Sequence, residues 1–152
     1  MTAYVSDTYF DKYLFESDPD LLKSICKEMS NLIPREAEIL AGLEMGGIPV
    51  VTMLSQVTGL PSAFIRKDAK PYGTCKYAEG PDLKGKRVAI IEDVVSTGGA
   101  IIDAVKKMET DGIIPISIIC VIDRQTGGAE NLETKGYTLQ SVFKMSQIEN
   151  AL

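Results

Sequence analysis

The chain alternates between two kinds of hydrophobic pattern. Short, wholly apolar runs such as residues 88–91 are typical of strands that are covered on both faces. Longer segments repeat their apolar residues every three or four positions, as Leu22, Ile25 and Met29 do, and this period indicates amphipathic helices. Strands are predicted near residues 38–41, 63–65, 88–91, 113–122 and 137–142, and helices near residues 19–33, 48–57 and from residue 101 onward. Such alternation favours one α/β domain, residues 1–152, with a central, mainly parallel sheet flanked by helices.

The most informative segment is residues 88–100, in which an apolar run is followed by Glu92-Asp93 and then by hydroxyls and glycines. Because helical spacing resumes at Ile101, residues 96–100 are expected at the N-terminus of a helix. Free backbone N–H groups and the helix dipole there favour a phosphate monoester, and the two carboxylates suit hydroxyl donors. We therefore expect a ribose 5-phosphate at the carboxyl end of this strand. The chain has no Walker A loop and no dinucleotide fingerprint.

Composition narrows the chemistry further. A net charge of −5 and a pI near 4.8 give no reason to expect a nucleic acid or an anionic membrane as partner. Cys26, Cys75 and Cys120 are scattered, which argues against a disulfide framework or a zinc site, and with no membrane span or signal peptide we expect a cytoplasmic protein. The chain has no histidine, so ordinary Ser-His and Cys-His nucleophiles are excluded. Catalysis must then rely on positioning and electrostatics.

Residues 66–85 form a long segment without a convincing period. It contains several prolines and glycines, and its first half carries Arg66, Lys67, Lys70 and Lys76 against a single acid, Asp68. A solvated charged loop is one interpretation of this composition. A lid that clamps a pyrophosphate accounts for both the length and the charge, because loops this long in compact domains are usually functional or disordered.

Residues 92–99 resemble the phosphoribosyl pyrophosphate (PRPP) signature of type I phosphoribosyltransferases. Residues 64–73 are similar to the mobile catalytic loop of the orotate phosphoribosyltransferases in that family, and residues 42–49 resemble their pyrophosphate loop, which often contains a non-proline cis peptide. Asp123-Arg124 is similar to the family's Asp-Arg element, and residues 6–11 resemble the stretch that lines its orotate pocket. The resemblance covers about residues 6 to 143 and implies the type I phosphoribosyltransferase fold.

The chain departs from the family pattern at three places. Tyr72 stands where the mobile loop usually has a histidine. Gly46 stands where many relatives have a lysine, so one cationic contact is expected to be missing. Only five residues precede Ser6, so the N-terminal hood over the base is expected to be reduced.

The resemblance also implies roles for residues. Arg66, Lys67 and Lys70, with Asp93, are the implied catalytic residues, and Arg124 would contact the carboxylate of orotate. Mg²⁺ would be bound mainly through PRPP, with no metal-ligating residues of the protein's own. The lid would cross the interface of a homodimer. The implied substrate-binding residues are Glu92, Asp93, Val94, Val95, Ser96, Thr97, Gly98, Gly99, Ala100, Arg124, Tyr9, Phe10, Glu44, Met45, Gly46 and Tyr72.

These implications predict an enzyme that joins orotate to PRPP and releases orotidine 5′-monophosphate and pyrophosphate, a step of pyrimidine biosynthesis. Two alternatives remain open at this level. The enzyme could take another base, which would keep the PRPP residues and remove the role of Arg124. The protein could also bind PRPP or a nucleotide as a non-catalytic regulator, although the complete basic lid favours catalysis.

Overall fold

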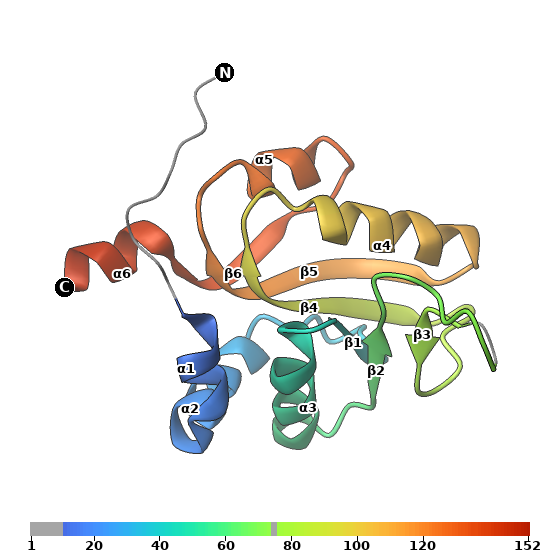
Figure 1. Ribbon diagram of the computed structural model, residues 1–152, viewed down its shortest axis with the longest axis horizontal. Helices are drawn as coiled ribbons and strands as arrows, with labels where there is room; N and C mark the ends of the chain where they lie inside the picture. Colours follow the sequence, from blue (N-terminus) through green and yellow to red (C-terminus); the bar gives the residue numbers. More distant parts are fainter. Residues whose placement is uncertain (1–10, 74–75) are drawn as a thin grey trace.

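The computed structural model describes residues 11–73 and 76–152. The strands in this part of the chain are β1 (Ile39–Leu43), β2 (Ser62–Ile65), β3 (Ala78–Glu79), β4 (Arg87–Val95), β5 (Ile114–Asp123) and β6 (Leu139–Lys144). They form one sheet in the order β3-β2-β1-β4-β5-β6, shown in Figure 1. All neighbours are parallel except β2 and β3, which pair antiparallel. The predicted α/β class and mainly parallel sheet are confirmed.

Helices cover both faces of the sheet (Figure 1). The helices α1 (Lys12–Ser17), α2 (Pro19–Ser30) and α3 (Gly47–Thr58) pack on one face, and α4 (Gly99–Thr110) and α5 (Gly128–Glu133) pack on the other. The helix α6 (Met145–Ala151) follows the edge strand β6. Strand β4 lies between two hydrophobic cores, and its residues from Val88 to Ile91 are fully buried. This double burial explains the wholly apolar run in the sequence.

The predicted strands and helices are all found, with shifted ends. The largest correction concerns β4, which continues to Val95 instead of ending at Ile91. The extension follows from β5, which pairs with β4 as far as Val95 opposite Asp123. Glu92 and Asp93 therefore lie within the strand, near its carboxyl end. The long segment after β2 contains the short strand β3, and the helices α1, α5 and α6 were not predicted.

The described part of the chain contains no helix with the length and apolar character needed to cross a membrane.

Candidate active site

The carboxyl ends of β1, β4 and β5 are neighbours in the sheet, and the turns that follow them meet there. Glu92 and Asp93 lie near the end of β4. Asp93 is 1% exposed; the Val94 N–H donates to its Oδ1 at 2.6 Å, and its own N–H donates to Glu92 Oε1 at 3.1 Å. Backbone N–H groups of β4 therefore fix the position of both carboxyl groups.

The pKa values of the two carboxyl groups are shifted in opposite directions. Burial, followed by the hydrogen bond and charge of Asp93, raises the pKa of Glu92 to about 9. Burial also acts to raise the pKa of Asp93, but hydrogen bonds from Glu16, Glu92, Lys12 and a backbone N–H outweigh it and hold that pKa below its ordinary value. At neutral pH Asp93 therefore carries the negative charge, and Glu92 holds a proton in the ligand-free protein.

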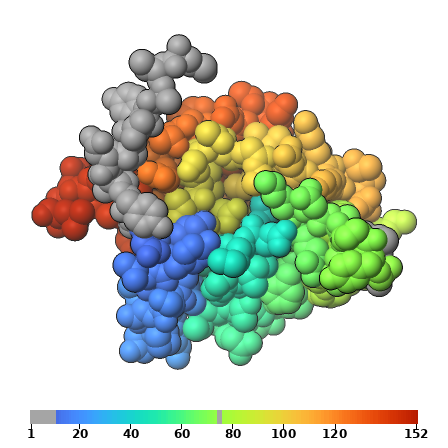
Figure 2. Space-filling view, in the orientation of Figure 1, coloured from blue at the N-terminus to red at the C-terminus, as the bar shows by residue number. Residues whose placement is uncertain are grey.

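The turn after β4 has the form expected of a phosphate site. Ser96 and Thr97 are exposed, Gly98 has a left-handed conformation with φ of 81°, and α4 begins at Gly99 with no side chain capping its first N–H groups. Residues 92 and 94–101 line a hollow of about 180 Å³. Figure 2 shows this turn, in yellow, on the same face as α1, in blue, and the start of α3, in cyan. Uncapped N–H groups at a helix start favour an anion.

Helix α5 supports this turn from outside, which the sequence did not indicate. Asn131 Nδ2 donates to the Thr97 carbonyl at 2.9 Å. Gly128 packs so closely that a Cβ there would lie 2.7 Å from the Ser96 carbonyl oxygen. The glycine pair 127–128 at the start of a short polar helix was the available signal, because a glycine often marks a close approach of two backbones.

The turn after β1 closes against Asp93. The peptide bond between Glu44 and Met45 is cis, as is frequent in the loop that this segment resembles. Gly46 is buried, and a Cβ at this position would lie 1.9 Å from Asp93 Oδ2. The Glu44 carboxylate accepts a hydrogen bond from the Lys67 N–H, which joins this turn to the start of the basic segment. The glycine at position 46 is thus required by packing on the acidic pair.

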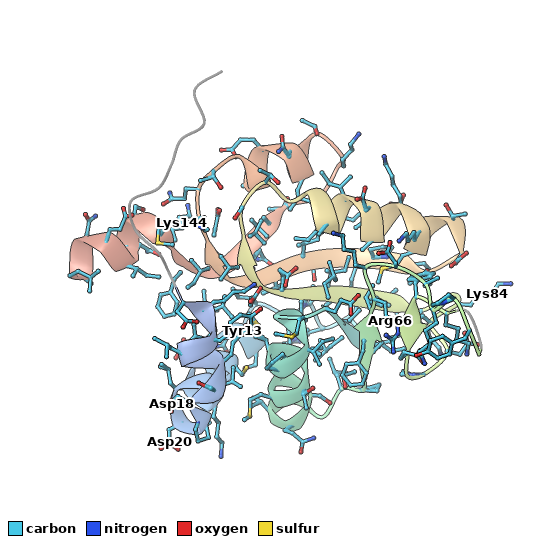
Figure 3. All side chains as sticks on the ribbon, viewed as in Figure 1. Tyr13, Asp18, Asp20, Arg66, Lys84 and Lys144 are labelled. Atoms are coloured by element: carbon cyan, nitrogen blue, oxygen red, sulfur yellow. The ribbon has the colours of Figure 1, made fainter. Side chains whose placement is uncertain are left out.

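The basic side chains of residues 66–72 are not gathered on the acidic pair. Glu79 Oε1 lies 3.4 Å from Arg66 Nε and 2.8 Å from Lys70 Nζ, so both cations pair with strand β3. Lys67 and Tyr72 are exposed. In Figure 3, Arg66 lies on the β2–β3 side of α3, and Tyr13 of α1 lies on the other side. Their predicted contact with pyrophosphate stays a prediction.

The base side of the predicted site is partly described. Arg124 is half-buried directly after β5, and its N–H donates to the Val95 carbonyl at 3.0 Å, which places it beside the end of β4. Asp123 is buried and accepts the Gln125 N–H at 2.8 Å. Tyr9 and Phe10 lie outside the described residues.

Sequence reasoning missed Lys12 and Glu16 of α1. Lys12 Nζ lies 3.0 Å from Asp93 Oδ2, and the carboxyl group of Glu16, a residue 8% exposed, lies close enough to Asp93 for each to shift the pKa of the other. Their spacing of four residues puts both on one helix face. That spacing was a usable signal only if the six-residue helix could be foreseen.

Comparison with known proteins agrees with this geometry. The family model "Phosphoribosyl transferase domain" matches residues 19–146. An orotate phosphoribosyltransferase of a Nocardioides species is 46% identical over 143 residues, which cover 94% of this chain and 80% of the relative. The orotate phosphoribosyltransferase of Methanocella arvoryzae is 38% identical, with 94% and 82% covered.

Solved structures give the same result. The orotate phosphoribosyltransferase of Mycobacterium tuberculosis in complex with PRPP superposes with a TM-score of 0.81 at 27% identity, and the match covers 91% of this chain and 82% of that one. The chain therefore belongs to the phosphoribosyltransferase family, and within it to the orotate phosphoribosyltransferases.

Proposed function

We propose that this protein transfers the 5-phosphoribosyl group of PRPP to orotate, which gives orotidine 5′-monophosphate and pyrophosphate. The observation that carries the proposal is the acidic pair Glu92-Asp93 followed directly by the uncapped glycine turn that opens α4. Relatives up to 46% identical bear the name of this activity. Arg124, at the same edge of the sheet, supplies the cation that an orotate carboxylate requires.

The turn and the acidic pair bind different parts of PRPP. The N–H groups and hydroxyls of residues 96–100 bind the 5-phosphate, and Glu92 and Asp93 accept hydrogen bonds from the ribose hydroxyls. Displacement at the anomeric carbon passes through a ribose with oxocarbenium character. The negative charge of Asp93 beside the ribose then stabilises the positive charge that develops on the ring.

The basic lid stabilises the leaving pyrophosphate. Arg66, Lys67 and Lys70 neutralise its developing charge when the lid closes, and closure also excludes water. Mg²⁺ would add further charge neutralisation at the pyrophosphate. The described residues offer no group of three or more His, Cys, Asp or Glu side chains that could hold a metal, so its ligands would come mainly from PRPP oxygens.

We also propose a homodimer in which the lid completes the site of the partner subunit. The support is the position of Arg66 and Lys70, which pair with Glu79 of their own chain instead of with Glu92 or Asp93. The proposed base contacts are Arg124 for the orotate carboxylate and Ser96 for the pyrimidine ring. Sedimentation of the purified protein tests the dimer, and a monomer with full turnover would refute it.

A spectrophotometric assay of orotate consumption with PRPP and Mg²⁺ tests the reaction. The double variant Lys67→Ala/Lys70→Ala is expected to lose turnover, while Lys84→Ala/Lys86→Ala, which removes the same charge from exposed positions, retains it. A wild-type protein that binds PRPP by calorimetry but consumes no orotate would overturn the proposal. Turnover with another base in place of orotate would assign the site to that base.

A further inference from the structure

Three ionisable side chains surround Asp93, and two of them come from α1. Lys12 and Glu16 reach it from α1, and Glu92 adjoins it on β4. Lys12 forms an ion pair with Asp93, with its Nζ 3.0 Å from Oδ2. Neither Lys12 nor Glu16 belongs to a turn that faces the phosphate or the base. Their common feature is contact with one carboxylate.

The hydrogen-bonding pattern requires a proton between two of these acids. Both Glu16 oxygens are buried without a hydrogen-bond donor among the described residues, and the buried Oδ2 of Asp93 has only the ion pair with Lys12. The two carboxyl groups lie close enough to shift the pKa of each other, and two buried carboxyl groups can pair only if one of them is protonated. A shared proton pairs one oxygen of Glu16 with Asp93 Oδ2.

The proton belongs to Glu16. Asp93 receives the ion pair of Lys12 and the N–H of Val94, and both stabilise its ionised form. Glu16 receives no comparable donor and is 8% exposed. A buried carboxyl group without donors is stable only in its neutral form.

We propose that Glu16 and Lys12 are positioning residues for Asp93: the neutral Glu16 donates its O–H to Asp93 Oδ2, and Lys12 keeps that carboxylate ionised and oriented toward the ribose. The proposal rests on the function proposed above, in which Asp93 binds the ribose hydroxyls of PRPP. It assigns α1, a short helix remote from the PRPP turn in sequence, to substrate binding. Neither residue touches PRPP in this arrangement.

The arrangement makes PRPP binding depend on pH. Burial, followed by the hydrogen bond and charge of Asp93, raises the pKa of Glu16 to about 8, and Lys12 acts in the opposite direction. The raised pKa means that the neutral donor is fully present at low pH and is lost as pH rises through about 8. Ionised Glu16 would then repel Asp93 instead of donating to it. The apparent KM for PRPP should therefore rise in alkaline solution.

One of the other groups around Glu16 also titrates in alkaline solution, and the rest do not. On β4 these are Asp93 and, beside it, Glu92, whose pKa is also raised by burial, so its ionisation adds to the alkaline rise in KM. On α1 it is Lys12, which stays cationic because its pKa is raised. From α2 the buried titratable side chain is Cys26, whose thiol donates to the Val50 carbonyl and stays neutral because burial raises its pKa to about 12.

The test compares the full-length protein with Glu16→Gln and Glu16→Met by the KM for PRPP across pH. Gln keeps a neutral donor at every pH, so its KM should match wild type near pH 7 and show a smaller alkaline rise than wild type, since Glu92 still ionises. Met has no donor, so its KM should be raised at all pH values by about twofold to tenfold, as expected for one hydrogen bond. Glu28→Gln on the exposed face of α2 is the charge-matched control and should follow wild type.

Two results would overturn the inference: a wild-type KM for Glu16→Met, or an alkaline rise for Glu16→Gln equal to that of wild type. Glu16→Gln preserves shape and polarity, and thermal unfolding checks that it folds. The dissociation constant of PRPP, measured by calorimetry without orotate, separates this inference from the proposed reaction. Binding with the expected pH pattern but no orotate turnover would refute only the reaction, and turnover without the pattern would refute only the positioning role.

Discussion

Gly46→Ala is the substitution that most directly tests the packing of the acidic pair. Gly46 has φ of −62° and ψ of −31°, which any residue adopts, so alanine causes no backbone strain. The new Cβ would lie 1.9 Å from Asp93 Oδ2, whereas real Cβ contacts essentially never fall below 3.0 Å. The Asp93 carboxylate must therefore move by about 1 Å, and its separation from Lys12 Nζ, now 3.0 Å, changes with it.

The expected free-energy change has two parts of opposite sign. At a compatible backbone conformation, Gly→Ala alone stabilises a protein by about 0.4–1 kcal/mol. Forcing extra volume into a packed site costs about 1–3 kcal/mol, and Asp93, at 1% exposure, has no open solvent to move into. We expect a net loss of about 1–2 kcal/mol in the free energy of unfolding. Displacement of Asp93 should also weaken PRPP binding, by about tenfold for each 1.4 kcal/mol.

Urea unfolding and calorimetric titration with PRPP measure the two effects. Gly99→Ala is the control for stability, because among the described residues its Cβ would approach only Thr97 Oγ1, at 3.9 Å. That variant should be at least as stable as wild type. Gly46→Ala with undiminished stability and an unchanged dissociation constant for PRPP would refute the placement of Gly46 against Asp93.

Two further substitutions test the supports of the turn and of the lid. Asn131→Leu removes the donor to the Thr97 carbonyl, and we expect a loss of about 0.5–1.5 kcal/mol in PRPP binding energy, measured by calorimetry; unchanged binding would contradict the support role. Glu79→Gln releases Arg66 and Lys70 from their ion pairs. Because these pairs are only partly buried, the change in stability should be small, while the KM for PRPP should fall, most at low salt; an unaltered KM would show that Glu79 does not compete with pyrophosphate.

Local pattern was sufficient for the strands, the longer helices and the phosphate turn. Residues 88–91 read as a buried strand because helices cover both of its faces, and residues 96–100 read as a helix start because helical spacing resumes directly after them. Both signals lie within about ten residues of each other in sequence. The strand end was misplaced because Glu92 and Asp93 are polar, and their pairing with β5 depends on residues far along the chain.

The supporting contacts were not predictable for the same reason. Lys12 and Asp93 lie far apart in the sequence, with several strands between them. Arg66 and Glu79 are separated by a loop without a regular period. A six-residue helix such as α1 has too few positions for hydrophobic periodicity to be recognised. Gly46 illustrates the limit: the sequence shows that no lysine stands there, but not that a Cβ at this position would meet Asp93.

The ribose side and the pyrophosphate side of the site balance their charges in different ways. PRPP is a polyanion, yet the carboxylates that must accept its ribose hydroxyls are negative themselves. Around Asp93 the chain solves this within the folded core: Lys12 balances one charge, and protons on Glu16 and Glu92 keep the remaining acids neutral. For the pyrophosphate the compensating cations are on a lid, where Glu79 pairs with them in the ligand-free protein. Substrate binding must therefore exchange one carboxylate partner for a phosphate at the lid, whereas the charge of Asp93 is already balanced by Lys12 before PRPP binds.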